Sequence, residues 1–165
     1  MSADIVVLGV GNLLLSDEGV GPTTIAYLGR RWSFPPGVEL VDGATAGLEL
    51  MNLFGEAAHI IVVDTVRGGA EPGALYRFHP DEVPVDLSYR ASIHQLSFVD
   101  AWQMARLLGA APDITVIGVE PADMSTPRVG LTPTIEARLP VIEELVLEEL
   151  ARLGVRPEPR PDRED

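Results

Sequence analysis

The sequence predicts an α/β fold of three αβα layers, in which helices cover both faces of a five-stranded, mostly parallel sheet with one antiparallel strand. Short apolar runs alternate with amphipathic segments, and the first run is apolar throughout, as in a strand buried on both faces. The 165 residues, 46% of them hydrophobic, suffice for one domain. We place that domain at 1–155 and expect a flexible, charged, proline-rich tail at 156–165.

Strands and helices alternate in the first half of the chain. The strands are expected in short, mostly apolar stretches, and the helices where apolar residues recur at helical spacing. In order, these are a strand at 5–10, a helix at 20–31, a strand at 38–41, a helix at 48–54 and a strand at 59–63.

The second half continues this pattern with one exception. The glycine- and proline-rich link 67–73 is too short for a crossover helix, so the strand after it cannot easily run parallel to the strand before it. Pro140 lies inside the last helical pattern and should kink that helix or mark a restart. The expected elements are a strand at 74–78, a polar loop at 79–93, a helix at 95–108, a strand at 114–119 and a helix at 133–153.

Composition excludes several classes of function. A net charge of −13 and a pI near 4.5 argue against nucleic acid or an anionic membrane as partner. The chain has no lysine, which excludes Schiff-base and P-loop lysine chemistry, and no cysteine, which excludes thiol nucleophiles, thiolate metal sites and disulfides. No apolar run approaches the length of a bilayer span, so we expect a cytoplasmic protein, and a monomer because no long apolar stripe is left over.

Acidic side chains and one histidine gather where the strands are expected to end. The glycine-rich turn after the first strand carries Asp17 and Glu18, Asp42 ends the second strand, Asp64 ends the third, and His94 opens a later helix. In an open α/β sheet the ligand crevice lies at this edge. Because these like charges need a counterion, and oxygen and imidazole donors suit nickel, zinc or manganese, a metal site is indicated.

Most of these residues also have an ordinary structural interpretation. Asp17 could cap the helix that follows it, Glu18 could favour the first helical turn through the helix dipole, and Asp42 could bond the backbone of its own turn. An acid directly after a buried strand, as at Asp64, is harder to explain in this way. His94 could likewise be a residue at the start of a helix with no functional role.

The two remaining histidines, His59 and His79, are interpreted as structural, with no acidic partner on their edge of the sheet.

Other catalytic signatures fit less well. The turn Gly9-x-Gly11-x-x-Leu14 lacks the third glycine of dinucleotide sites, although Asp42 as a ribose ligand keeps that alternative open. Carboxylates in the turn would also repel a phosphate. A Gly-x-Ser-x-Gly nucleophile elbow and a His-Glu-x-x-His zinc signature are both absent from the sequence.

Six motifs, in the expected order, together resemble those of the hydrogenase maturation proteases, endopeptidases that remove a C-terminal extension from the large subunit of nickel–iron hydrogenases. The likeness runs along almost the whole chain, through Gly9–Gly21, Asp42–Gly47, Val62–Asp64, Ser92–Gln95, Gly118–Pro121 and Gly130–Pro133.

The resemblance implies both a catalytic site and a substrate. Glu18, Asp64 and His94 match the residues that converge on a metal in that family, and they are the expected catalytic and metal-binding residues here. The metal would be nickel that arrives within the hydrogenase large-subunit precursor and serves as the recognition signal. The general base stays open, with Asp17 and Asp42 as candidates.

Recognition of the precursor is expected in the loop after the second strand, at Asp42, Gly43, Ala44 and Thr45. Two positions depart from the family pattern: Ala44 replaces a frequent second glycine, and Thr65 follows Asp64 where a small apolar residue is common. Further recognition is expected in the loops 66–73, 79–93 and 121–131.

Two other functions remain as alternatives. A nickel-sensing checkpoint or chaperone protein would bind metal through the same three residues without cleaving anything. A general metallo-aminopeptidase would cleave short unrelated peptides and would usually need more metal ligands.

Overall fold

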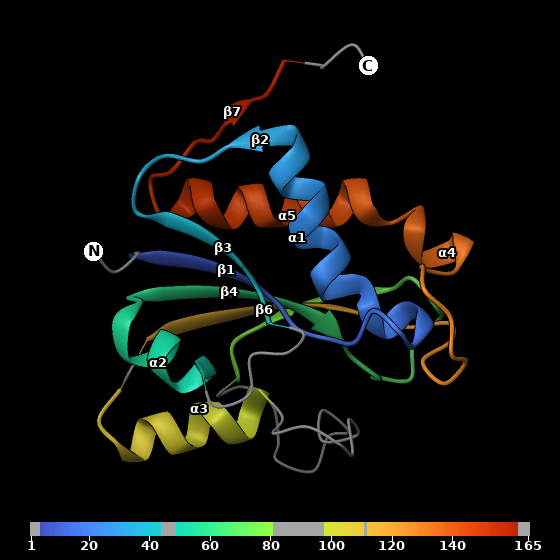
Figure 1. Cartoon of the computed structure of the whole chain (residues 1–165), viewed down its shortest axis with the longest axis horizontal. Coiled ribbons are helices and arrows are strands. Elements are labelled where there is room, and N and C mark those ends of the chain that lie inside the picture. Colours follow the sequence, from blue (N-terminus) through green and yellow to red (C-terminus); the bar gives the residue numbers. More distant parts are fainter. Residues whose placement is uncertain (1–3, 44–48, 81–97, 111, 162–165) are drawn as a thin grey trace.

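The computed structural model of the chain describes residues 4–43, 49–80, 98–110 and 112–161. Helices cover both faces of a central sheet (Figure 1): α1 (Val20–Arg31) and α5 (Leu139–Arg152) lie on one face, and α2 (Glu49–Glu56) and α3 (Phe98–Leu107) lie on the other. The predicted three-layer αβα fold is therefore confirmed.

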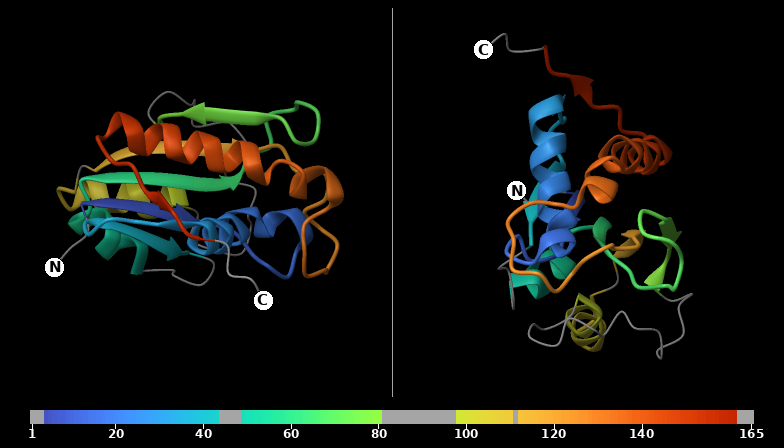
Figure 2. Two further views of the ribbon diagram at one scale, coloured as in Figure 1. Left: turned by 90° about the horizontal axis from the view of Figure 1, so that it is seen from above. Right: turned by 90° about the vertical axis from the view of Figure 1, so that its right-hand side faces the viewer.

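The central sheet has five strands in the order β3-β1-β4-β6-β5. Only β5 runs antiparallel, against β6, as the short link before it predicts (Figure 2). The other neighbouring pairs are parallel, so that their carboxyl ends meet at one edge. The strands are β1 (Ile5–Gly9), β3 (Val38–Asp42), β4 (His59–Thr65), β5 (Leu75–Phe78) and β6 (Asp113–Val119).

Two apolar cores lie on opposite faces of this sheet. Along β1, Ile5 and Val7 point toward α1 and α5, whereas Val6 and Leu8 belong to the core beneath α2 and α3. Side chains alternate between the two faces of a strand, so a strand covered on both sides must be apolar at every position. This explains the continuous apolar run with which the sequence begins.

Two element boundaries, the end of β4 and the start of α5, differ from the sequence prediction or decide between its alternatives. Strand β4 continues to Thr65, so Asp64 lies inside the strand, paired with Gly118 of β6, rather than after its end. The last helical pattern divides into α4 (Pro133–Glu136) and α5, and Pro140 stands in the first turn of α5. Proline lacks an N–H group, which the first turn does not need, so the predicted restart is confirmed.

A second, two-stranded sheet joins distant parts of the chain. Strand β2 (Trp32–Ser33) pairs antiparallel with β7 (Glu158–Pro159). The backbone N–H of Arg160 donates to the carbonyl of Arg31 at 2.8 Å, and its Nε donates to the carbonyl of Trp32 at 2.9 Å. This pairing involves part of the segment predicted as a flexible tail; the flexibility itself stays a prediction.

Within the described ranges, no helix is both long enough and apolar enough to cross a bilayer. The expected helix starts at 48 and 95, and the part of the polar loop from 81 to 93, lie outside those ranges.

Candidate functional site

The turn between β1 and α1 is built on glycines that let the helix pack directly against strand ends. A Cβ atom on Gly21 would lie 2.3 Å from the carbonyl oxygen of Val10 and 2.6 Å from that of Val63. Gly11 has a φ of +146°, a conformation that side chains disfavour, with the carbonyl oxygen of Glu18 against it. The turn therefore brings Glu18 close to the carboxyl ends of β1 and β4.

Glu18 lies in a short 3-10 helix, η1 (Ser16–Gly19), and its side chain is half-buried. Burial raises the pKa of its carboxyl group, and the positive charge of Arg67 acts in the opposite direction and lowers it. A carboxylate that has lost part of its hydration gains when a cation binds to it. Glu18 thus has the electrostatic character of a metal ligand.

Asp64 reaches the same edge of the sheet from β4, which contacts η1. Its side chain is half-buried, and its Oδ1 accepts a hydrogen bond from the backbone N–H of Thr65 at 2.8 Å. That bond needs only the backbone of residue 65, so threonine serves there as well as a smaller residue. The structure therefore places the segments of Glu18 and Asp64 side by side.

The predicted recognition residues Asp42 and Gly43 stand at the end of β3, at the same edge. Asp42 is exposed, and its backbone pairs with Gly9 of β1. The N–H of Gly43 donates to the carbonyl of Gly9 at 2.7 Å, and a Cβ on Gly43 would lie 2.9 Å from that oxygen. The tight contact explains why glycine follows Asp42.

The other predicted site residues, Ala44, Thr45 and His94, lie outside the described residues. Without His94, the described ranges contain no group of three or more His, Cys, Asp or Glu side chains that could hold a metal ion. The three-residue metal set of Glu18, Asp64 and His94 therefore stays a prediction. Its chemistry fits, because the half-buried Glu18 and the nearby Asp64 supply carboxylate oxygens, and oxygen donors can bind divalent metal ions.

Asp17 has a different role from the helix cap that the sequence suggests. The N-cap of α1 is Gly19, and no side chain bonds to it. Asp17 is fully buried, and its carboxylate accepts hydrogen bonds from the backbone N–H groups of Ala122, Asp123 and Thr132 at 2.8–2.9 Å and from the Thr132 hydroxyl. It fastens the turn carrying Glu18 to the distant segment 121–132 and explains the Gly130–Pro133 motif.

Glu120 makes a second internal anchor, which sequence reasoning missed. Its side chain is buried at the end of β6, and its Oε2 accepts hydrogen bonds from the N–H of Gly68 at 2.7 Å and the hydroxyl of Tyr76 at 2.9 Å. Burial, and next the bond to Glu120, raise the pKa of the Tyr76 phenol. The sequence feature that could have indicated this role of Glu120 is the Gly118–Pro121 motif, which lies at the end of a predicted strand.

A third acid, Asp123, organises the turn that follows it. Its carboxylate accepts bonds from the N–H groups of Ser125 and Thr126 and from the Thr126 hydroxyl, and these bonds lower its pKa from 3.8 to about 2. The turn is therefore stabilised above about pH 4, and this contribution is lost as the pH falls toward 2.

We expect Thr126→Val to raise the pKa of Asp123 toward its ordinary value, because the Thr126 hydroxyl is the largest cause of the shift. An NMR titration of the Asp123 carboxyl carbon measures this change. Ser125→Ala is the matched control and should move the pKa less, since its hydroxyl is the smallest cause. An unchanged pKa in Thr126→Val would contradict the assignment.

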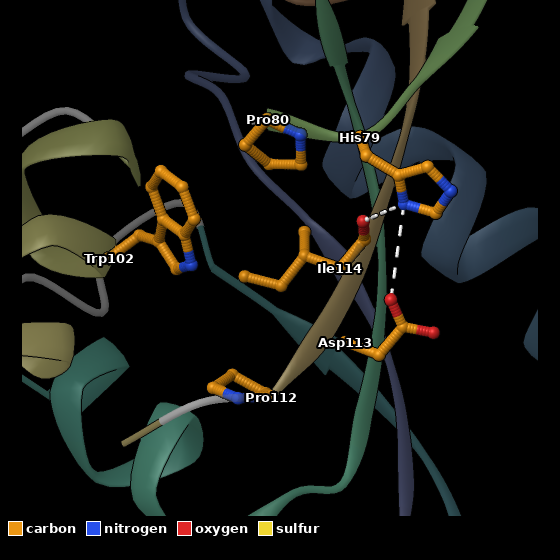
Figure 3. A pocket seen from close by; sticks show the side chains of 6 residues that line it. All are labelled: His79, Pro80, Trp102, Pro112, Asp113 and Ile114. Carbon is orange, nitrogen blue, oxygen red and sulfur yellow. Dashed lines mark hydrogen bonds and ion pairs between the residues drawn. The ribbon is translucent and has the colours of Figure 1, made fainter. Parts of the chain in front are cut away.

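The opposite edge of the sheet carries a hollow of about 200 Å³ between β6 and α3, lined by Trp102 and two prolines (Figure 3). His79 donates from Nδ1 to the carbonyl of Ile114 at 2.8 Å and lies 3.9 Å from Asp113, which also approaches His59 at 3.3 Å. The expectation that these histidines lack an acidic partner is therefore wrong. Their structural interpretation is consistent with these contacts, which join the start of β6 to the start of β4 and to the end of β5.

Several known proteins are similar to this chain in both sequence and fold. Residues 22–149 match the model of the hydrogenase maturation protease family. The hydrogenase 2 maturation protease of Escherichia coli (strain K12) is 38% identical over 158 residues, covering 94% of this chain and 96% of that protein. The hydrogenase expression/formation protein HupM of Azotobacter chroococcum is 38% identical over 161 residues, covering 96% of this chain and 77% of that protein.

Solved structures agree with these relatives. The hydrogenase maturating endopeptidase HybD from E. coli superposes with a TM-score of 0.86 at 38% identity, covering 94% of this chain and 97% of that one. A hydrogenase 2 maturation peptidase from a Thaumarchaeota archaeon gives a TM-score of 0.68 at 27% identity, covering 89% of this chain and 97% of that one. The motifs, the fold and these matches together show that the chain belongs to the hydrogenase maturation protease family.

Proposed function

We propose that this protein is an endopeptidase that removes the C-terminal extension of a nickel–iron hydrogenase large-subunit precursor after nickel insertion. The observation that carries the proposal is the half-buried Glu18, held at the same sheet edge as Asp64. Its family membership supports peptidase activity on a hydrogenase precursor. We further infer that it acts in the cytoplasm as a monomer.

In this proposal Glu18, Asp64 and His94 bind the nickel that the precursor presents. Oxygen and imidazole donors suit that ion. Burial has already removed part of the hydration of Glu18, so less water must be displaced when the precursor docks. Once bound, the ion supplies Lewis-acid polarisation of the scissile carbonyl.

Asp42, Gly43, Ala44 and Thr45 are proposed to recognise the precursor. The exposed carboxylate of Asp42 faces solvent, and the tightly packed Gly43 fixes the direction in which the chain leaves β3. The loop that follows would then meet the substrate close to the strand ends. Asp17 is a poor general base, because four donors already bond its carboxylate.

The test is cleavage of candidate large-subunit precursors, with and without nickel, followed by mass spectrometry of the precursor C-terminus. We expect a mass loss only with nickel-loaded precursor, and at least about 100-fold slower processing by Glu18→Gln, Asp64→Asn and His94→Ala. Asp113→Asn and His59→Ala, at the opposite sheet edge, are matched controls and should process normally.

Normal processing by all three folded site variants would refute the proposal. Metal-dependent binding of the precursor without shortening would instead identify a nickel-sensing checkpoint protein. Cleavage of short unrelated peptides would identify a general metallo-aminopeptidase.

A further inference from the structure

We propose that an exposed apolar ledge, formed by Leu13, Leu14 and Val129, docks an extended segment of the precursor in which an apolar residue stands next to an acidic one. The segment adds as a strand to the free backbone edge of Val129. This inference rests on the proposed function for the identity of the partner. Binding of such a segment depends on the ledge alone and is measured separately.

The apolar ledge brings together large exposed side chains from two distant parts of the chain. Leu13 is 40% exposed, Leu14 64% and Val129 73%. The N–H of Arg128 donates to the carbonyl of Leu14 at 3.0 Å, and the N–H of Ser16 donates to the carbonyl of Arg128 at 2.9 Å. The turn after β1 and the segment before α4 accordingly lie side by side in Figures 1 and 2. Apolar side chains grouped at a surface are typical of interaction sites.

The backbone beneath the apolar ledge is held in an unusual conformation. Ser16 has a φ of +53°, which residues other than glycine rarely adopt, and it is buried. The buried carboxylate of Asp17, next to it, accepts hydrogen bonds from the segment before α4. Strained backbone persists where the surrounding structure holds it, and it is concentrated at ligand-binding sites. The two leucines are thus kept at the surface by an anchored turn.

Val129 presents a free backbone edge for an extended peptide. Leu15 and Arg128 form an isolated parallel bridge, so the backbone groups of Arg128 face the turn. Backbone groups of successive extended residues point in opposite directions, so those of Val129 face away from it. Within the described parts of the chain, neither the N–H nor the carbonyl of Val129 has a hydrogen-bond partner. An extended peptide can add to such an edge through main-chain bonds, and Pro127, which lacks an N–H, limits the pairing to a short stretch.

The position of the apolar ledge fits the substrate of an endopeptidase. The N–H of Glu18 donates to the carbonyl of Leu15 at 3.2 Å, and the carbonyl of Glu18 accepts from the N–H of Asn12 at 3.1 Å. The ledge and Glu18 therefore belong to one closed turn. A peptide bond inside a helix or sheet is shielded from attack, so an endopeptidase needs an extended substrate segment beside its site. The free edge at Val129 offers such a segment a place to bind.

Arg128 indicates which side chains the docked segment carries. Side chains alternate between two faces along an extended chain, so a residue that faces Val129 is followed by one on the face of Arg128. Arg128 is exposed and forms no ion pair with the other described residues. The chain has 25 Asp and Glu against 12 Lys and Arg, so an arginine without an internal carboxylate partner is available for an external one. We therefore expect an acidic residue beside the apolar one.

The first test is an NMR titration of the ¹⁵N-labelled full chain with the capped peptide acetyl-Val-Glu-Val-Glu-Val-amide. We expect the amide signal of Val129 to shift. Leu14→Ala and Val129→Ala should each raise the Kd about 5- to 10-fold, because they withdraw methyl groups from the contact. Leu107→Ala is the matched control: Leu107 is 87% exposed at the end of α3 and should leave the Kd unchanged.

The charge preference is tested with the same peptide and its analogue with lysine in place of glutamate. Arg128→Gln should raise the Kd of the glutamate peptide about 3- to 5-fold and should not raise that of the lysine peptide. Arg30→Gln is the control, because Arg30 is exposed in the last turn of α1 and its loss changes the net charge equally. It should move both Kd values less than Arg128→Gln does.

The second test measures processing of nickel-loaded precursor. Leu14→Ala and Val129→Ala should raise KM about 5- to 10-fold and leave kcat within about twofold, since they remove binding that is equal in the ground and transition states. Leu107→Ala should process like the parent. Urea unfolding of each variant verifies that these exposed substitutions leave the fold intact.

An unshifted Val129 amide, or equal Kd values for the parent, Leu14→Ala and Val129→Ala, would overturn the proposal. Unchanged KM in both variants would exclude the precursor as the occupant and would leave the proposed function in place. Peptide binding at the apolar ledge, together with a precursor that the parent does not shorten, would support the ledge and contradict only the endopeptidase activity.

Discussion

Asp17→Ala is expected to lower the free energy of unfolding by about 3–5 kcal/mol and to abolish processing of the precursor. The substitution leaves three backbone N–H groups, those of Ala122, Asp123 and Thr132, without their acceptor in a fully buried place. Each unpaired buried donor is destabilising by about 1–3 kcal/mol. The turn that carries Glu18 would also lose the hydrogen bonds by which Asp17 holds it against the segment 121–132.

Urea unfolding followed by tryptophan fluorescence measures the stability change. Thr132→Val is the matched control, because it removes one hydroxyl donor and keeps the backbone bond, and it should destabilise by only about 1 kcal/mol. Asp17→Asn should resemble Asp17→Ala, since an amide places its own donors against backbone donors. Parent-like unfolding of Asp17→Ala would contradict the structural role given to this carboxylate.

Glu18→Gln is expected to behave in the opposite way: it should lose processing without losing stability. Burial raises the pKa of Glu18 in the folded protein, so the folded state holds this proton more tightly than the unfolded state. The contribution of Glu18 to stability therefore falls as the pH rises from its unfolded pKa, near 4.5, through the raised folded value. Glutamine has no charge to desolvate and avoids this loss.

The measurement is urea unfolding of parent and variant at pH 5 and pH 8. The variant should gain stability relative to the parent between the two pH values, in line with the sign of the pKa shift. Glu39→Gln, an exposed glutamate on β3, is the control and should show no such gain. If Glu18→Gln is less stable than the parent at pH 8, burial does not govern this carboxyl.

Local sequence pattern was enough to predict most of the fold. Helix α1 spans Val20–Arg31, as its apolar spacing indicates, and the antiparallel β5 follows from the length of the link before it. Both signals are carried by neighbouring residues. The carboxylates of Glu18 and Asp64 reach one edge because parallel strands end there, which the order of strands and helices already implies.

The misjudged features depend on contacts between residues far apart in the chain. Asp17 looks like a helix cap in sequence, but its partners lie 105 to 115 residues away. His59 and Asp113 meet because β4 and β6 are neighbours, and β7 pairs with β2 although most of the domain separates them in sequence. No periodicity within a window of ten or twenty residues contains such information.

Asp17 and Glu120, two buried acids, stabilise the conformation of the loops largely independently of which residues are exposed on them. Asp17 accepts hydrogen bonds from three backbone N–H groups and Glu120 from one, and every residue except proline possesses such a group, so these bonds do not depend on the side chains at the surface. Exposed positions such as Arg67 and Val129 can therefore be exchanged without rebuilding the loops. The fold in this way offers a fixed frame on which preference for a different precursor could be engineered by surface substitutions alone.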